Sequence, residues 1–159
     1  MKHLIAAALI FAAGGQARAE EDPNYFYSVS FSSGFAVTRY AKPEYADKLK
    51  SGRSNCVVVN WAYASKDENN LDDLKSERER ASEAIAAELS TKSEPVVAAT
   101  TLGGATGLWV IYTGAGEELA NALDGRLRQL SQSKYRVRLA NDSEWSMYAK
   151  YVERLREKQ

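Results

Sequence analysis

Hydrophobic and polar residues alternate in the N-terminal part of the chain, which is typical of half-buried β-strands. Residues 25–40, YFYSVSFSSGFAVTRY, contain two such runs around the SSG tripeptide at 32–34. A short loop that contains glycine between two strand patterns predicts a β-hairpin. The segment 42–52, KPEYADKLKSG, then predicts a short helix. Residues 56–63, CVVVNWAY, form an apolar run that predicts a central strand.

Patterns typical of helices and of strands then alternate along the rest of the chain. We expect a helix at 71–89, strands at 95–102 and 108–112, a helix after Gly116 and a strand at 135–139. A terminal helix is expected after the N-cap candidates at 141–143.

The order strand, helix, strand, strand, helix, strand between residues 56 and 139 decides the fold class. It predicts an α+β domain with a ferredoxin-like split βαβ, in which an antiparallel sheet carries two helices on one face. The N-terminal β-hairpin should extend or flank this sheet, and the C-terminal helix should cover what remains open. No linker or repeat divides residues 20–159, so we expect a single domain there.

The first nineteen residues read as a secretory signal peptide. Lys2 precedes an apolar run from Leu4 to Ala13, and Ala17-Arg18-Ala19 has the small-x-small form of a cleavage site. The run is about half the roughly 20 residues that a membrane span requires. We therefore expect cleavage after Ala19, a periplasmic or secreted protein, and no membrane span.

The amino-acid composition limits the kinds of partner and of site chemistry that we expect. The chain has 21 basic and 21 acidic side chains, and loss of Lys2 and Arg18 with the signal leaves 19 against 21, a net charge of −2. This balance argues against nucleic acid as a partner. The only histidine, His3, lies in the predicted signal, so the mature chain has none for acid–base or metal chemistry. The only cysteine, Cys56, opens an apolar run and is expected to be buried, the alternative being an intermolecular role for an accessible thiol.

The acidic segment 67–73, DENNLDD, offers the oxygen ligands that calcium prefers. Counted from Asp67, however, Asp72 stands where an EF-hand loop needs glycine and Arg78 where it needs a bidentate glutamate. Acidic residues also favour the start of a helix on their own. We therefore predict no metal site and no cofactor.

Two groups of residues are candidate sites. Arg136 and Arg138 share one face of a strand at the predicted sheet edge, and Asn60 is expected on the same side. Exposed charge on an edge strand protects against aggregation, but the same side chains also suit the docking of an anion or a protein. Asp142, Trp145 and Tyr148 form the second group. They suit either a helix cap with aromatic packing or a ligand cleft with Asp142 at its polar end.

The segment from Asn141 to Tyr151, NDSEWSMYAKY, resembles the closing D-x-x-W-x-x-Y signature of the DUF695 family, a bacterial domain of unknown function. The positions that carry the resemblance are Asp142, Trp145, Tyr148 and Tyr151. The hairpin, the strands CVVVNWAY and LWVIYTG, and the first long helix are also similar, so the resemblance covers residues 25–155. One departure is the segment Asn70-Leu71-Asp72-Asp73, which replaces a Gly-x-Pro type of turn. The resemblance implies an α+β fold and no activity.

These observations favour an exported, non-catalytic binding or protein-interaction module, with an envelope protein or a small ligand as its partner. The alternative is a small carboxylate-dependent hydrolase that acts on cell-envelope material, because a catalytic carboxylate pair has no fixed spacing in sequence. Two carboxyl groups facing each other in one pocket would favour the hydrolase, and a basic or aromatic patch would favour the binding module.

Overall fold

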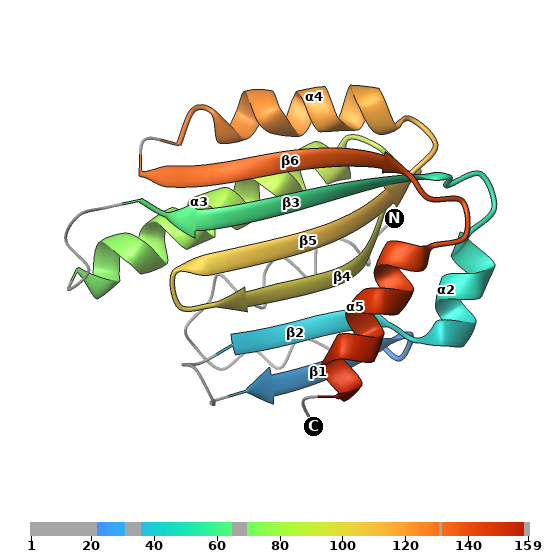
Figure 1. The fold of residues 1–159 in the computed structure, drawn as a ribbon. Coiled ribbons are helices and arrows are strands. Elements are labelled where there is room, and N and C mark those ends of the chain that lie inside the picture. The colour runs from blue at the N-terminus through green and yellow to red at the C-terminus, as the bar shows by residue number, and fades with distance from the viewer. Residues whose placement is uncertain (1–21, 31–35, 65–69, 131, 158–159) are drawn as a thin grey trace.

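The computed structural model describes residues 22–30, 36–64, 70–130 and 132–157 (Figure 1). The predicted signal peptide, the SSG turn of the hairpin and residues 67–69 of the acidic segment lie outside this part of the chain. Its elements are β1 (Tyr25–Ser30), β2 (Ala36–Ala41), α2 (Pro43–Leu49), β3 (Asn55–Tyr63), α3 (Leu71–Ser90), β4 (Val96–Gly103), β5 (Thr106–Thr113), α4 (Gly116–Leu127), β6 (Ser133–Asn141) and α5 (Ser146–Arg156).

One antiparallel sheet contains all six strands in the order β1-β2-β4-β5-β3-β6. Its last four strands, with α3 and α4 as their connections, form the ferredoxin-like split βαβ that the sequence predicts, so the expected α+β class is confirmed. The β1–β2 hairpin extends the sheet through antiparallel pairing of β2 with β4. β6 forms the opposite edge.

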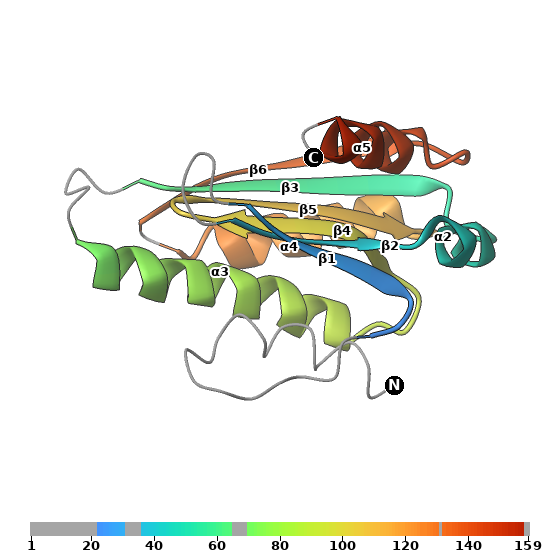
Figure 2. The same cartoon turned by 90° about the horizontal axis from the view of Figure 1, so that it is seen from below.

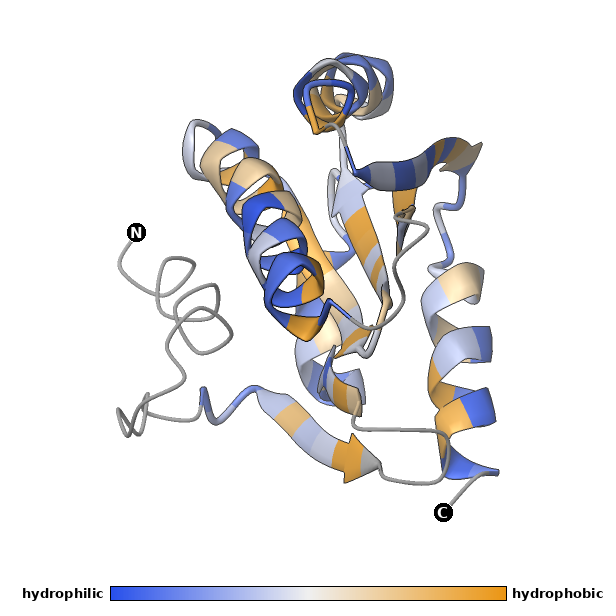
Figure 3. Cartoon of the chain, turned by 90° about the vertical axis from the view of Figure 1, so that its left-hand side faces the viewer, coloured by the Kyte–Doolittle hydropathy of each residue, from blue (hydrophilic) through white to orange (hydrophobic). Residues whose placement is uncertain are grey.

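Helices cover the two faces of the sheet unequally. Figure 2 shows α3 and α4 together on one face and α5 alone on the other, and Figure 3 shows the sheet edge-on between these layers. In Figure 1, α5 crosses only the end of its face that lies near α2. Among the described residues, no helix therefore covers much of that face. None of the helices in the described residues is long and apolar enough to span a membrane.

The central strand β3 shows how the side chains divide between the two faces. Val57, Val59 and Trp61 belong to the hydrophobic cluster beneath α3 and α4, whereas Cys56 and Val58 belong to the cluster beneath α5. Asn60 follows Val58 on the same face by the period of two, but it is exposed. The apolar run of this face thus ends where α5 no longer covers the sheet.

The edge strand β6 alternates as predicted, with one difference. Tyr135 and Val137 pack against the cluster beneath α3 and α4, and Arg136 and Arg138 are exposed on the other face. Leu139, which shares the face of Tyr135 and Val137 by the period of two, is 44% exposed. An edge strand has neighbours on one side only, so its apolar face is only half covered.

The start of α5 corrects the sequence prediction. The helix begins at Ser146, not directly after 141–143, and Trp145 precedes it in a left-handed conformation with φ 58°. Such a conformation is uncommon for a bulky residue. It is held here because the Trp145 ring stacks on Tyr112, with centroids 4.0 Å apart and the planes 11° from parallel.

Candidate functional site

A row of side chains runs across five strands of the sheet face on which α5 lies, from the buried Thr38 near α5 to the exposed Arg136 at the sheet edge. Antiparallel register places these residues opposite one another: Thr38 in β2, Thr101 in β4, Leu108 in β5, Asn60 in β3 and Arg136 in β6. The row is polar at both of its ends and at Asn60. A sheet face that a helix covers completely would be apolar instead. This register explains why the predicted pair Asn60 and Arg136 lies side by side.

The structure brings all three residues of the first candidate group together. Asn60 lies directly opposite Arg136, and Val58, two residues earlier, lies opposite Arg138. Residues directly opposite in an antiparallel pair have Cβ atoms about 5 Å apart. The side chains of Asn60, Arg136 and Arg138 are therefore neighbours on one exposed face.

A groove of about 900 Å³ follows this row, with the sheet as its floor and α5 as one wall. Its size is typical of ligand-binding pockets. Besides Asn60, Arg136 and Arg138, its principal lining side chains are Thr38, Thr101, Leu108, Lys134, Tyr151, Arg154 and Leu155. Lys134 and Arg154 were not among the residues predicted for this site. Lys134 could have been predicted, because it shares a face with Arg136 and Arg138 by the alternation of β6. The position of Arg154 depends on where α5 crosses the sheet, which no local pattern shows.

Four of the lining side chains are positively charged: Lys134, Arg136, Arg138 and Arg154. Within the described residues, no aspartate or glutamate lines the groove, and no ion pair involves any of the four. Some basic residues elsewhere are paired, as Arg126 is with Glu88 on α3 at 2.5 Å, whereas others, such as Lys48 and Lys75, form no ion pair with the described residues. Uncompensated charge of one sign in a hollow attracts ligands of the opposite sign. The groove therefore favours an anionic ligand.

Hydroxyl groups fix the wall of the groove to its floor. The Thr38 and Thr101 hydroxyls are hydrogen-bonded at 3.1 Å, and the hydroxyl of Tyr151 on α5 is hydrogen-bonded to that of Thr101. Leu155, one turn further along α5, packs against the cluster beneath the helix. These contacts hold the groove-facing side of α5 in place.

The second candidate group also comes together, around Tyr112. The Asp142 carboxylate accepts hydrogen bonds from the Tyr112 hydroxyl at 2.6 Å and from the backbone N–H groups of Ser146 at 2.8 Å and Met147 at 2.9 Å. Burial alone would raise the pKa of Asp142, but the bonds from Ser146, Tyr112 and Met147 outweigh it and hold this pKa below its usual value. Asp142 thus caps α5 from before its first turn.

The two aromatic residues of this group have their polar atoms engaged within the protein. Tyr148 donates from its hydroxyl to the Ala41 carbonyl oxygen at 2.5 Å. Trp145 is fully buried and donates from its indole N–H to the Arg53 carbonyl oxygen at 3.0 Å. These bonds attach α5 to the ends of β2 and of the α2–β3 connection.

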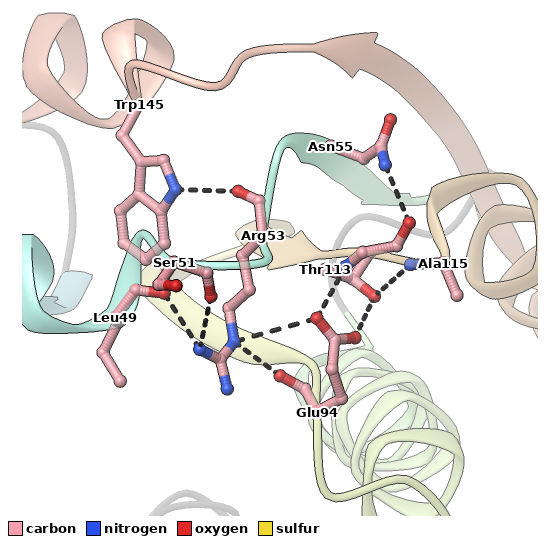
Figure 4. A network of polar contacts seen from close by, with 9 residues as sticks. Leu49, Ser51, Arg53, Asn55, Glu94, Thr113, Ala115 and Trp145 are labelled. Atoms are coloured by element: carbon pink, nitrogen blue, oxygen red, sulfur yellow. Dashed lines mark hydrogen bonds and ion pairs between the residues drawn. The ribbon is translucent and has the colours of Figure 1, made fainter.

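Figure 4 shows how the network continues from Trp145. The Arg53 guanidinium donates to the carbonyl oxygens of Leu49 at 2.9 Å and Glu94 at 2.7 Å. The Glu94 carboxylate accepts from the Thr113 hydroxyl and from the Gly114 backbone N–H at 2.6 Å. The network therefore joins three connections of the fold to the start of α5 and is structural.

A second groove, of about 840 Å³, lies between α2 and α5. It contains carboxylates, namely Asp47, Glu144, Glu153 and Glu157, all exposed and interspersed with Lys50, Lys150 and Arg156. Across the described ranges, no cluster of three histidine, cysteine, aspartate or glutamate residues has a geometry that could hold a metal ion. Cys56 is fully buried.

A protein-family model described as a family of unknown function, DUF695, matches residues 26–152. The chain belongs to the DUF695 family. The resemblance seen in the sequence is thereby confirmed, and the match spans β1 to α5, including both candidate groups. No curated protein and no solved structure matches this DUF695 chain.

Proposed function

We propose that this DUF695 protein is a non-catalytic binding module whose groove beside α5 binds an anionic partner. One observation carries the proposal: the groove gathers Lys134, Arg136, Arg138 and Arg154 around Asn60 with no carboxylate in its described lining. Guanidinium groups bind carboxylate or phosphate through paired hydrogen bonds. The Asn60 amide adds two donors and an acceptor.

We further propose that the module acts in the periplasm or after secretion, with an envelope protein or a small ligand as its partner. The support is the order of charge, apolar run and small-x-small site in residues 1–19. The hydrolase alternative requires two carboxyl groups about 5–10 Å apart in one hollow. The carboxylates of the α2–α5 groove are exposed and lie beside lysines, which suits a solvated surface.

Retention on immobilised poly-glutamate tests the binding proposal. Wild-type protein, the double variant Arg136→Ser/Arg138→Ser and the control Lys48→Ser/Lys75→Ser are eluted with increasing salt. Lys48 and Lys75 are exposed on α2 and α3, away from the groove lining. Both variants lose two positive charges, so a difference between them reports the site and not the net charge.

We expect the groove variant to elute at clearly lower salt than the control variant. Equal elution of the two variants would mean that the groove does not bind anions and would overturn the proposal. Release of soluble fragments from purified envelope material by both variants would instead support the hydrolase.

A further inference from the structure

We infer that the anionic partner is an acidic polypeptide segment that adds to β6 as an extended strand. This inference rests on the proposed function, because it names the partner of the same groove. It starts from the position of β6, which is at the edge of the sheet and pairs only with β3 among the described strands. The outer side of its backbone thus presents N–H and C=O groups that can pair with a further strand.

The exposure of β6 is consistent with such an addition. None of its nine residues is buried, whereas five of the nine residues of β3 are. α4 packs on the face of β6 that carries Tyr135, whose hydroxyl donates to the Asp124 carboxylate at 3.0 Å. The opposite face opens into the groove. A nine-residue edge is long enough for a typical strand of five or six residues.

The charges of β6 select the kind of strand. Lys134, Arg136 and Arg138 occupy alternate positions on the groove side, about 7 Å apart along the strand. An added strand has the same period, so acidic residues at every second position would each lie opposite one of these cations. A second copy of β6 would instead bring like charges opposite one another, which is destabilising. Charge complementarity therefore favours an acidic partner over self-pairing.

The other face of β6 defines the intervening positions of the partner. Val137 is half-buried and Leu139 is 44% exposed, and both lie on the face that α4 covers incompletely. Apolar side chains of an added strand would extend this surface and remove part of it from water. The structure thus assigns the partner an alternating pattern of acidic and apolar residues over five or more positions.

Fluorescence anisotropy with three labelled nine-residue peptides tests the inference on the full chain. The first alternates glutamate and valine, the second has the same sequence with N-methyl groups on one edge of the backbone, and the third has the same composition in two blocks. A nine-nucleotide oligothymidine serves as a polyanion without strand-forming backbone. Wild type, Arg136→Ser/Arg138→Ser and Lys48→Ser/Lys75→Ser are compared.

We expect the alternating peptide to bind wild type and the lysine control at least tenfold more tightly than the N-methylated and block peptides do. Its affinity for the arginine double variant should be at least tenfold lower than its affinity for wild type. Hydrogen exchange should then slow at the β6 amides that do not bond to β3, a change that side-chain binding alone would not produce.

Equal binding of the alternating and N-methylated peptides, lost in the arginine variant, would overturn strand addition while leaving the anion-binding function intact. Tighter binding of oligothymidine than of the alternating peptide would also overturn the inference, in favour of nucleic acid. No difference between wild type and the arginine variant for any probe would overturn the inference together with the proposed function.

Discussion

The hydroxyl of Tyr112, on β5, donates a hydrogen bond of 2.6 Å to the carboxylate of Asp142, just before α5. The same hydroxyl accepts the backbone N–H of Tyr148 at 3.1 Å. The residue that caps the last helix and a residue of its first turn are thus both bonded to one side chain of the sheet. Because α5 is a wall of the groove, these bonds set the position of Tyr151 and Arg154 relative to Asn60.

The low pKa of Asp142 predicts a pH dependence of stability. Its folded-state pKa lies below the unfolded value, which is about 3.9 for aspartate. The corresponding stability is present above that value and is lost as the pH falls through the folded-state pKa. Urea unfolding between pH 7 and pH 2 should therefore show a decline below about pH 4, part of which disappears in Asp142→Asn.

At pH 7, Asp142→Asn should lower the free energy of unfolding by about 2 kcal/mol, because its hydrogen bonds become neutral. Asp47→Asn is the control, since Asp47 is exposed and its bond to Lys50, at 2.8 Å, lies on the surface. Exposed pairs contribute about 0–1 kcal/mol. Identical pH profiles for wild type and Asp142→Asn would contradict this prediction.

The indole N–H of Trp145 predicts a second stability effect. Trp145→Phe keeps an aromatic ring against Tyr112 but leaves the Arg53 carbonyl oxygen without this donor. We expect a loss of about 1–3 kcal/mol beyond the effect of the smaller ring. Trp109→Phe measures that effect of size, because no hydrogen bond from the Trp109 indole occurs among the described contacts. Equal losses in urea unfolding of the two variants would show that the bond contributes nothing.

Cys56 should react slowly with thiol reagents in the folded protein. Its side chain is fully buried, and burial raises the pKa of the thiol to about 11, so little thiolate forms at neutral pH. Labelling with a chromogenic disulfide reagent at pH 8 should be at least about 100-fold slower in buffer than in urea, since the thiolate is the nucleophile. Rapid labelling of the native protein would indicate an accessible thiol and support an intermolecular role.

Two glycines of α4 predict opposite outcomes for the same substitution. A Cβ atom on Gly116 would lie 2.6 Å from both the Cβ atom of Asn55 and the Cδ1 atom of Leu139, so Gly116→Ala should destabilise the fold by about 1–3 kcal/mol. A Cβ atom on Gly125 meets nothing within 4 Å. Gly125→Ala should therefore stabilise the helix by about 0.5–1 kcal/mol. Thermal unfolding of both variants measures the difference. A stabilised Gly116→Ala would contradict the packing at Gly116, and a destabilised Gly125→Ala would contradict the open space at Gly125.

Local patterns in the sequence were sufficient to predict the strands, the helices and their ferredoxin-like order. They also predicted Asn60, Arg136 and Arg138 on one face, because alternation in a strand fixes which residues share a side. The predicted start of the last helix was wrong, because the left-handed backbone of Trp145 depends on stacking against Tyr112, 33 positions earlier in the chain. Arg154 was missed for the same physical reason, since the crossing of α5 over the sheet is decided by tertiary contacts.

The proposed binding surface, on the part of the sheet that α5 leaves uncovered, is separate from the residues that form the hydrophobic core. Asn60, Arg136 and Arg138 belong to neither hydrophobic cluster, so substitutions there leave the core intact. Exposed substitutions of this kind change stability by about 0.5 kcal/mol or less. On the proposed function, a few point mutations at these positions would therefore change the binding partner while the chain keeps its fold at each step.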